Sequence, residues 1–122
     1  MSIQVARVYD HEAHPGRQFL VDRLWPRGVR KDDLPLDGWL KEVAPSDRLR
    51  KWFAHDPRRW TEFRRRYRAE LRAHAAALQP LRERGSRQRV TLLYAARDPR
   101  ISHALVLRSV LRAAPPKRTP RP

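Results

Sequence analysis

Two stretches rich in apolar residues, each too short for a typical helix, constrain the fold of this chain most strongly. They run from Gln18 to Trp25 and from Arg89 to Ala95. Apolar runs of this length are typical of strands that are buried on both faces, as in a parallel or mixed sheet. A third segment, Ile3 to Tyr9, alternates apolar and polar residues and predicts a half-buried strand.

The spacing of apolar residues becomes helical between the second and third predicted strands. Leu36 to Val43 predicts a short helix that Pro45 ends, and Ser46 is the candidate N-cap of a second short helix. Asp56 and Pro57 suit the N-cap and first residue of a long helix. Its apolar residues are Trp60, Phe63, Tyr67, Leu71, Ala75 and Leu78.

The long predicted helix and the last predicted helix each have identifiable end signals. We expect Pro80 to kink or end the long helix, with Gly85 as its C-cap. After the third strand, Asp98 followed by proline and Ser102 are rival N-caps of a final helix. The apolar residues of that helix are Ile101, Leu105, Leu107, Val110 and Leu111.

The order of these elements is strand, strand, three helices, strand, helix. This order predicts an α/β fold, a small Rossmann-like three-layer domain with a central, mostly parallel sheet flanked by helices. We expect a single domain over residues 1–113. Residues 114–122 contain four prolines and three basic residues and predict a disordered basic tail.

The composition of the 122 residues excludes several classes of chemistry. There is no cysteine, which excludes disulfides, thiolate metal sites and cysteine nucleophiles. No compact spacing of histidines and acidic residues resembles a metal-binding motif, and we expect no metal site. No apolar run approaches the roughly 20 residues of a membrane helix, and the N-terminus lacks the layout of a signal peptide. We therefore expect a cytoplasmic protein that is not bound to a membrane.

The net charge of +15 is concentrated in the second part of the chain. Residues 1–56 contain 10 basic and 9 acidic side chains, whereas residues 57–122 contain 18 and 4. One interpretation is an acidic partner such as nucleic acid, bound by an arginine-rich helix face and the basic tail. The other is a GC-rich genome, since only four of the 28 basic residues are lysines and the chain is rich in alanine and proline.

Polar side chains follow two of the predicted strands, where ligands of open α/β sheets bind. The loop that begins the long helix is expected beside them. The candidate ligand-binding residues are Asp22, Arg23, Trp25, Arg27, Gly28 and His55, and the candidate catalytic residues are Asp98 and His103.

Each candidate has a chemical role that its residue type suggests. Arg23 and Arg27 are suited to hold an anion, because a guanidinium forms paired hydrogen bonds with phosphate or carboxylate. Trp25 is suited to stack on a planar ligand, and Gly28 allows the backbone to approach one closely. His103, in the first turn of a helix, is suited to acid–base work or to donating to an anion.

Structural interpretations of the same residues remain open from the sequence. Asp22 and Arg23 can form an ion pair inside the domain, where an unpaired charge would be costly. His103 can be a capping or packing residue, and His55 can belong to the helix cap formed by Asp56. Trp39, Trp52 and Trp60 lie on apolar helix faces and are expected in the core. The dinucleotide, P-loop and hydrolase motifs are absent from the chain.

The stretch LVDRLWPRG, from Leu20 to Gly28, carries a resemblance to a known family. Together with KWFAHDP at residues 51–57 and LLYAARD at residues 92–98, it resembles the bacterial family called domain of unknown function 488, in its short YeaO-like branch. The resemblance implies an α/β fold of Rossmann-like layering and implies no particular reaction. Broader relatives carry a Cys-His-Arg string after the last strand, where this chain has Ser102, His103 and Ala104.

The leading functional hypothesis is a pocket at the strand ends that binds a small anionic or planar ligand. The residues suit a binding protein or an enzyme, and they identify no cofactor and no oligomeric state. Thiol chemistry is excluded, since a serine stands where the broader relatives have cysteine. The alternative hypotheses are a nucleic-acid-binding accessory protein and a purely structural or partner-binding domain.

Overall fold

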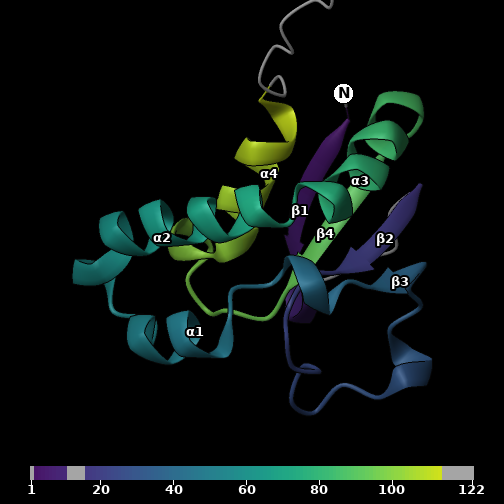
Figure 1. The fold of residues 1–122 in the computed structure, drawn as a ribbon. Coiled ribbons are helices and arrows are strands. Elements are labelled where there is room, and N and C mark those ends of the chain that lie inside the picture. Colours follow the sequence, from purple (N-terminus) through teal and green to yellow (C-terminus); the bar gives the residue numbers. More distant parts are fainter. Residues whose placement is uncertain (1, 11–15, 114–122) are drawn as a thin grey trace, which may run out of the picture.

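The computed structural model describes residues 2–10 and 16–113, which fold around one four-stranded sheet (Figure 1). The strands are β1 (Ile3–Arg7), β2 (Arg17–Leu20), β3 (Gly38–Trp39) and β4 (Val90–Tyr94). Their order across the sheet is β1-β4-β2-β3, and every pairing is parallel. All the strands therefore end at the same edge of the sheet. The predicted basic tail, residues 114–122, lies outside the described residues.

Four α-helices accompany the sheet in the described residues. They are α1 (Asp47–Phe53), α2 (Trp60–Ala73), α3 (Ala75–Arg87) and α4 (His103–Arg112). Short 3-10 helices lie at Val8–Asp10, Lys31–Asp33, Lys41–Val43, Pro57–Arg59 and Pro99–Ile101. No helix in the described part of the chain combines the length and the apolar character needed to cross a membrane.

The predictions of Ser46 and Ser102 as N-caps of α-helices are confirmed. Ser46 caps α1 by accepting a hydrogen bond from the Leu49 amide, and Ser102 caps α4 through the Ala104 amide. Asp56 and Asp98 each cap a 3-10 helix instead, with proline as the first residue. Both rival caps before α4 are thus used, one after the other.

The two faces of the sheet are covered differently. One buried cluster joins Phe19 of β2, the following Val21 and Leu92 of β4 to apolar residues of all four α-helices. The opposite face carries Leu20 and Leu93, which pack in a second cluster with residues of the segment 25–36. In Figure 1 the helices α1, α2 and α4 stand to the left of the strands, and this blue segment loops below and to the right. The predicted α/β class is confirmed, although loop and 3-10 turns form the third layer.

The second predicted strand is shorter than expected. β2 ends at Leu20, and only the Val21 amide continues the ladder by donating to the Leu93 carbonyl at 3.0 Å. The next possible ladder contact is taken over by a side chain, because Asp22 Oδ2 accepts from the Ala95 amide at 3.0 Å. The chain then leaves the sheet, and Leu24 is 58% exposed.

The short helix predicted over residues 36–43 is wrong. Gly38–Trp39 forms β3 and Lys41–Val43 forms a 3-10 helix. The unpaired edge of β2 captures this segment, because the Asp37 amide donates to the Gln18 carbonyl and the Leu40 amide to the Leu20 carbonyl, both at 2.8 Å. The apolar side chains of this segment pack on both faces of the sheet. Their spacing in the sequence therefore resembles that of an amphipathic helix.

The long predicted helix is interrupted at His74, not at Pro80. At the junction of α2 and α3, two hydrogen bonds span three residues instead of four. The His74 amide donates to the Leu71 carbonyl, and the Ala77 amide donates to the His74 carbonyl. Pro80 lies within α3, and the buried Gly85 also belongs to that helix instead of capping it. The change of direction allows the buried residues of α3 to join the core that α2 lines.

Candidate functional site

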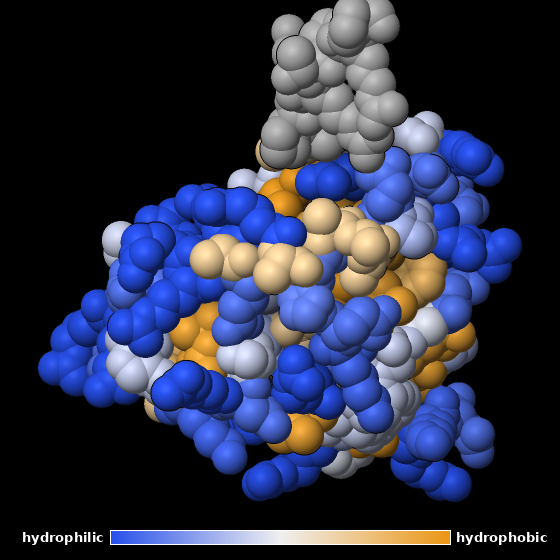
Figure 2. Space-filling model, in the orientation of Figure 1, coloured by the Kyte–Doolittle hydropathy of each residue, from blue (hydrophilic) through white to orange (hydrophobic). Residues whose placement is uncertain are grey.

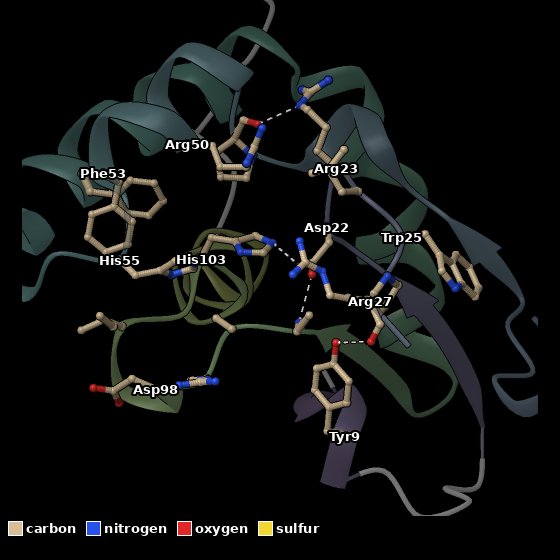
Figure 3. Close-up of a pocket in the computed structure, with 18 of the residues that line it drawn as sticks. Tyr9, Asp22, Arg23, Trp25, Arg27, Arg50, Phe53, His55, Asp98 and His103 are labelled. Carbon is tan, nitrogen blue, oxygen red and sulfur yellow. Dashed lines mark hydrogen bonds and ion pairs between the residues drawn. The ribbon is translucent and has the colours of Figure 1, made fainter. Parts of the chain in front are cut away.

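A cavity of about 560 Å³ opens at the edge of the sheet where β2 and β4 end (Figure 3). Its walls come from the loop after β2, the loop after β4, the segment from Pro45 to Pro57, the first residue of α4, and the side chains of Tyr9 and Phe63. The charged and histidine side chains in the wall are Asp22, Arg23, Arg27, Arg50, His55, Arg97, Asp98 and His103. The apolar part of the wall includes Trp25, Pro26, Pro45, Phe53, Pro57, Phe63 and Ile101.

The cavity brings together all but one of the residues proposed from the sequence. Gly28 does not line it. Gly28 has a positive φ of 78° and is the third residue of a turn closed by the Val29 amide and the Pro26 carbonyl. This geometry matches a type II turn, in which that position favours glycine. The structure thus assigns Gly28 to the turn that returns the chain from the cavity.

The centre of the site is the contact between Asp22 and His103. His103 Nε2 lies 3.2 Å from Asp22 Oδ1 and 2.9 Å from the Val21 carbonyl oxygen. A carbonyl oxygen can only accept, so the His103 Nε2 carries a proton and donates it to Val21. Both side chains are largely buried, at 14% exposed for His103 and 16% for Asp22.

Burial dominates the electrostatics of Asp22. Desolvation raises the pKa of its carboxyl above 3.8, while the His103 charge, the Ala95 amide and the His55 charge lower that pKa. The raised pKa means that burial outweighs these three partners together. The two carboxylate oxygens of Asp22 contact His103 and the start of the loop after β4.

Asp98 does not reach His103. Its carboxylate accepts from the Arg100 amide at 2.9 Å and pairs with the Arg100 guanidinium at 3.2 Å. These hydrogen bonds lower the pKa of Asp98. Figure 3 shows the Asp98 carboxylate pointing away from Asp22 and His103. The partner that orients His103 is Asp22, and Asp98 is a capping residue at the rim.

Asp22 and Arg23 do not pair with each other. The Arg23 Nε donates to the Pro45 carbonyl at 3.0 Å and lies 3.8 Å from Asp47 Oδ1. Asp22 turns toward the Ala95 amide just after β4, whereas Arg23 turns toward the start of α1. Arg27 is exposed, and its carbonyl accepts from the Tyr9 hydroxyl at 2.8 Å.

Trp25 borders the cavity and also packs elsewhere. Its ring meets Trp39 edge-on at 5.4 Å between centroids, and its Nε1 donates to the Val29 carbonyl at 2.7 Å. It belongs to the cluster on the far face of the sheet. The aromatic walls nearer the helices are Phe53 and Phe63, which stack at 4.2 Å between centroids.

His55 enters the wall through an unusual backbone. Ala54 and His55 have positive φ values of 47° and 55°, which non-glycine residues adopt at some energetic cost. Ala54 ends α1 in this conformation, and Asp56 caps the following 3-10 helix. The double left-handed turn connects two helices within a few residues and leaves the imidazole on the cavity wall.

Sequence reasoning missed several residues of the site. Arg50, Phe53 and Phe63 belong to helices and carried only the signal of helix periodicity. Arg97 lies in the loop that follows β4 and was detectable from its position near a strand end. A supporting contact was also missed: Glu70 of α2 accepts from both the amide and the hydroxyl of Ser46, at 2.8 and 2.6 Å.

Metal ligation has no cluster to support it in the residues that the structure describes. Across residues 2–10 and 16–113, no three His, Asp or Glu side chains come close enough to hold one ion.

The fold and the cavity define an α/β protein with a parallel sheet and a candidate ligand site at the strand ends. The family model described as "Inactive DUF488-N3 subclade" matches residues 2–120, nearly the whole chain. The chain belongs to this family, within domain of unknown function 488, and it is YeaO-like.

Two curated relatives illustrate the similarity. "Uncharacterized protein YeaO" of Escherichia coli (strain K12) is 46% identical over 114 residues, which covers 93% of this chain and 99% of the relative. "Uncharacterized protein Rv3073c" of Mycobacterium tuberculosis (strain ATCC 25618 / H37Rv) is 47% identical over 110 residues, or 89% and 92% of the two chains. No solved structure matches this chain significantly.

Proposed function

We propose that this protein binds a small organic anion with a planar or apolar body in the cavity at the strand ends. One observation carries the proposal: four arginines surround a largely apolar cavity whose two carboxylates already have partners. The arginines are Arg23, Arg27, Arg50 and Arg97. Asp22 Oδ2 accepts from the Ala95 amide and its Oδ1 lies 3.2 Å from His103 Nε2, while Asp98 pairs with Arg100.

The charge balance of the wall favours an anion. Four guanidiniums face two carboxylates, and low-dielectric walls concentrate the resulting positive potential. Within the described residues, no carboxylate lies within ion-pair distance of Arg27 or Arg97. A guanidinium binds carboxylate or phosphate through two parallel hydrogen bonds, which adds geometric selectivity to the attraction.

The apolar part of the wall favours a ligand whose body, apart from the anionic group, is apolar or planar. Phe53, Phe63 and Ile101 line the side nearest the helices, and the cavity volume is within the range of known small-molecule sites. A flat ring gains both buried area and favourable aromatic contact in such a place. Trp25 contributes an edge of this wall, since its ring also packs against Trp39.

Binding without turnover is the form of the proposal that the family supports. The matching family model is described as an inactive subclade. Ser102, which stands where the broader relatives have a cysteine, is fully buried and its hydroxyl caps α4. A hydroxyl in that position is not presented to a bound ligand.

The test is ligand-induced stabilisation combined with a local spectroscopic signal. We expect benzoate or phenyl phosphate to raise the melting temperature by several degrees at saturation, since a ligand at 100 times its Kd adds about 2.7 kcal/mol. In a proton–nitrogen NMR spectrum the Trp25 indole signal should shift, while that of Trp52, outside the cavity wall, should not.

A pair of variants separates the cavity from general attraction to a basic protein. Arg97→Gln removes a charge from the wall, and Arg48→Gln removes one from an exposed position of α1 outside it. Stabilisation should weaken in the first variant and persist in the second. Equal loss in both, or a Trp25 signal that no anion moves, would refute the proposal.

Nucleic-acid binding is a second candidate, favoured by the surface of α2. The arginines that are exposed there and in the preceding 3-10 helix are Arg58, Arg59, Arg65, Arg66 and Arg72. Trp52 lies among them, with the Arg66 guanidinium 4.3 Å and the Arg59 guanidinium 5.4 Å from its ring centre. Figure 2 shows hydrophilic residues covering the left side of the molecule, where Figure 1 places α1 and α2.

This second candidate has an opposing feature and a simple test. Glu62 bonds both Arg65 and Arg66, and Asp56 bonds Arg58, so much of the charge is compensated locally. Binding of a short DNA duplex through several phosphates should weaken steeply with salt. Replacing Arg58, Arg65 and Arg72 by glutamine should reduce both affinity and salt dependence. Affinity that ignores salt, or ignores this triple substitution, would exclude the α2 surface.

A further inference from the structure

Two of the cavity arginines are tied together by one carboxylate. Asp47 Oδ1 lies 3.3 Å from Arg50 Nη2 and 3.8 Å from Arg23 Nε. The Arg23 Nε also donates to the Pro45 carbonyl at 3.0 Å, which anchors its guanidinium to the start of α1. Figure 3 shows Arg23 and Arg50 on the same side of the cavity, away from Tyr9 and Asp98. The two guanidiniums therefore form one local unit, called here the Arg23–Arg50 pair.

The Arg23–Arg50 pair has hydrogen-bond donors to spare. Within the described residues, the two terminal nitrogens of Arg23 have no hydrogen-bond partner, and Arg50 uses only one of its nitrogens, on Asp47. The Arg50 Nε is shielded from solvent and lacks an acceptor. A buried donor without an acceptor is costly, so a ligand oxygen that meets this edge of the guanidinium after a small rotation gains a favoured contact.

The charges of the pair favour a doubly charged group. Two guanidiniums carry two positive charges, and the shared Asp47 side chain is 60% exposed, where water screens its negative charge. A carboxylate offers two oxygens and one charge to this unit. A phosphoryl group offers three oxygens and a charge near −2 at neutral pH, which matches the donors more fully.

We propose that the Arg23–Arg50 pair is the subsite for a phosphoryl group, and that the ligand is a phosphomonoester with a planar or apolar body. This inference rests on the proposed ligand-binding function and adds the chemical class of the ligand. Asp47 holds the two guanidiniums together before the phosphoryl group arrives. Phe53, which shares helix α1 with Arg50 and also lines the cavity, lies beside the body of the ligand.

The experiment uses two probes that share a ring and differ in the anion. Phenyl phosphate and benzoate are titrated into the full chain by calorimetry at pH 7.5, where the phosphate is mostly a dianion. We expect phenyl phosphate to bind at least tenfold more tightly than benzoate. Arg23→Gln and Arg50→Gln should each reduce the affinity for phenyl phosphate at least tenfold, and Arg48→Gln should change it less than twofold.

A conservative variant protects the test against loss of the fold. Arg50→Lys keeps the charge but loses the planar fork, and it should weaken phenyl phosphate binding severalfold with an unchanged circular dichroism spectrum. Phenyl phosphate affinity that resists Arg23→Gln and Arg50→Lys but falls in Arg97→Gln would overturn this inference and leave the proposed function standing. Equal affinity for the two probes would also overturn it. Failure of both probes to bind would count against the two proposals together.

Discussion

The imidazole of His103 lies 3.2 Å from the carboxylate of Asp22, so the first residue of α4 is held against the end of β2. The same carboxylate accepts from the Ala95 amide just after β4. One side chain thus joins two neighbouring strand ends and a helix start at the mouth of the cavity. The arrangement explains why a charged residue is kept inside an apolar stretch of the sequence.

The two aspartates of the cavity should have pKa values on opposite sides of 3.8, the usual value for an aspartate. Burial raises the pKa of Asp22, whereas hydrogen bonds from Arg100 lower the pKa of Asp98. Carbon-13 NMR of the two carboxyl groups between pH 2 and 7, a range of about five units around the reference value, measures both directly. A pKa of Asp22 at or below that of Asp98 would contradict the assigned environments.

The same shifts fix the sign of two contributions to stability. The pKa of Asp22 is raised on folding, so its stabilising contribution is full below pH 3.8 and is lost as the pH rises through the folded pKa. Asp98 behaves oppositely, and its contribution is present above pH 3.8 and is lost as the pH falls through the folded pKa. In urea unfolding of Asp22→Asn, the free energy of unfolding should no longer show the pH dependence that Asp22 contributes.

Replacing His103 should raise the pKa of Asp22 further. The His103 charge is the largest of the influences that lower this pKa, and leucine cannot supply it. Carboxyl NMR of His103→Leu should therefore show Asp22 titrating at higher pH than in the unaltered protein. His74→Leu, at the exposed break between α2 and α3, serves as the control and should leave Asp22 unchanged.

Loss of Glu70 should destabilise the fold through α1. Its carboxylate accepts from the amide and the hydroxyl of Ser46, the N-cap of α1. Glu70→Ala removes two hydrogen bonds to a charged group and should lower the free energy of unfolding by about 2 kcal/mol. Glu83→Ala on the exposed face of α3 should stay within about 0.5 kcal/mol. Similar values for the two variants in urea unfolding would show that the contact with Ser46 contributes little.

Two glycines with positive φ should respond differently to alanine. A Cβ at Gly28 would have no other atom within 4 Å. Gly28→Ala should therefore lower the free energy of unfolding only by the strain of a left-handed backbone, roughly 1 kcal/mol. A Cβ at Gly16 would lie 2.3 Å from the Arg89 carbonyl oxygen, where β2 begins beside β4. Gly16→Ala should therefore cost about 3 kcal/mol. Thermal unfolding gives both values, and an equal effect would refute the close approach.

Local chemistry explains the successes of sequence reasoning. Ser46, Asp56 and Ser102 bond to amides two or three residues away, so their capping role is visible in the sequence itself. The apolar run of β4 likewise predicted a strand buried on both faces. The helix predicted from Leu36 to Val43 was wrong because tertiary contacts outweighed the local signal. The spacing of its apolar residues is helical, but the edge of β2 supplies hydrogen-bond partners for its backbone.

The sequence by itself determined the α/β class, the strand ends that carry polar groups, and the membership of the family. The sequence did not determine which of these polar groups contact each other. From the sequence alone, Asp22 could pair with Arg23, and His103 could lie beside Asp98. The tertiary structure decided both pairings. Placing β4 beside β2 sets Ala95 against Asp22 and brings the start of α4 to the same carboxylate. Contacts between distant segments depend on strand order, which local periodicity does not encode.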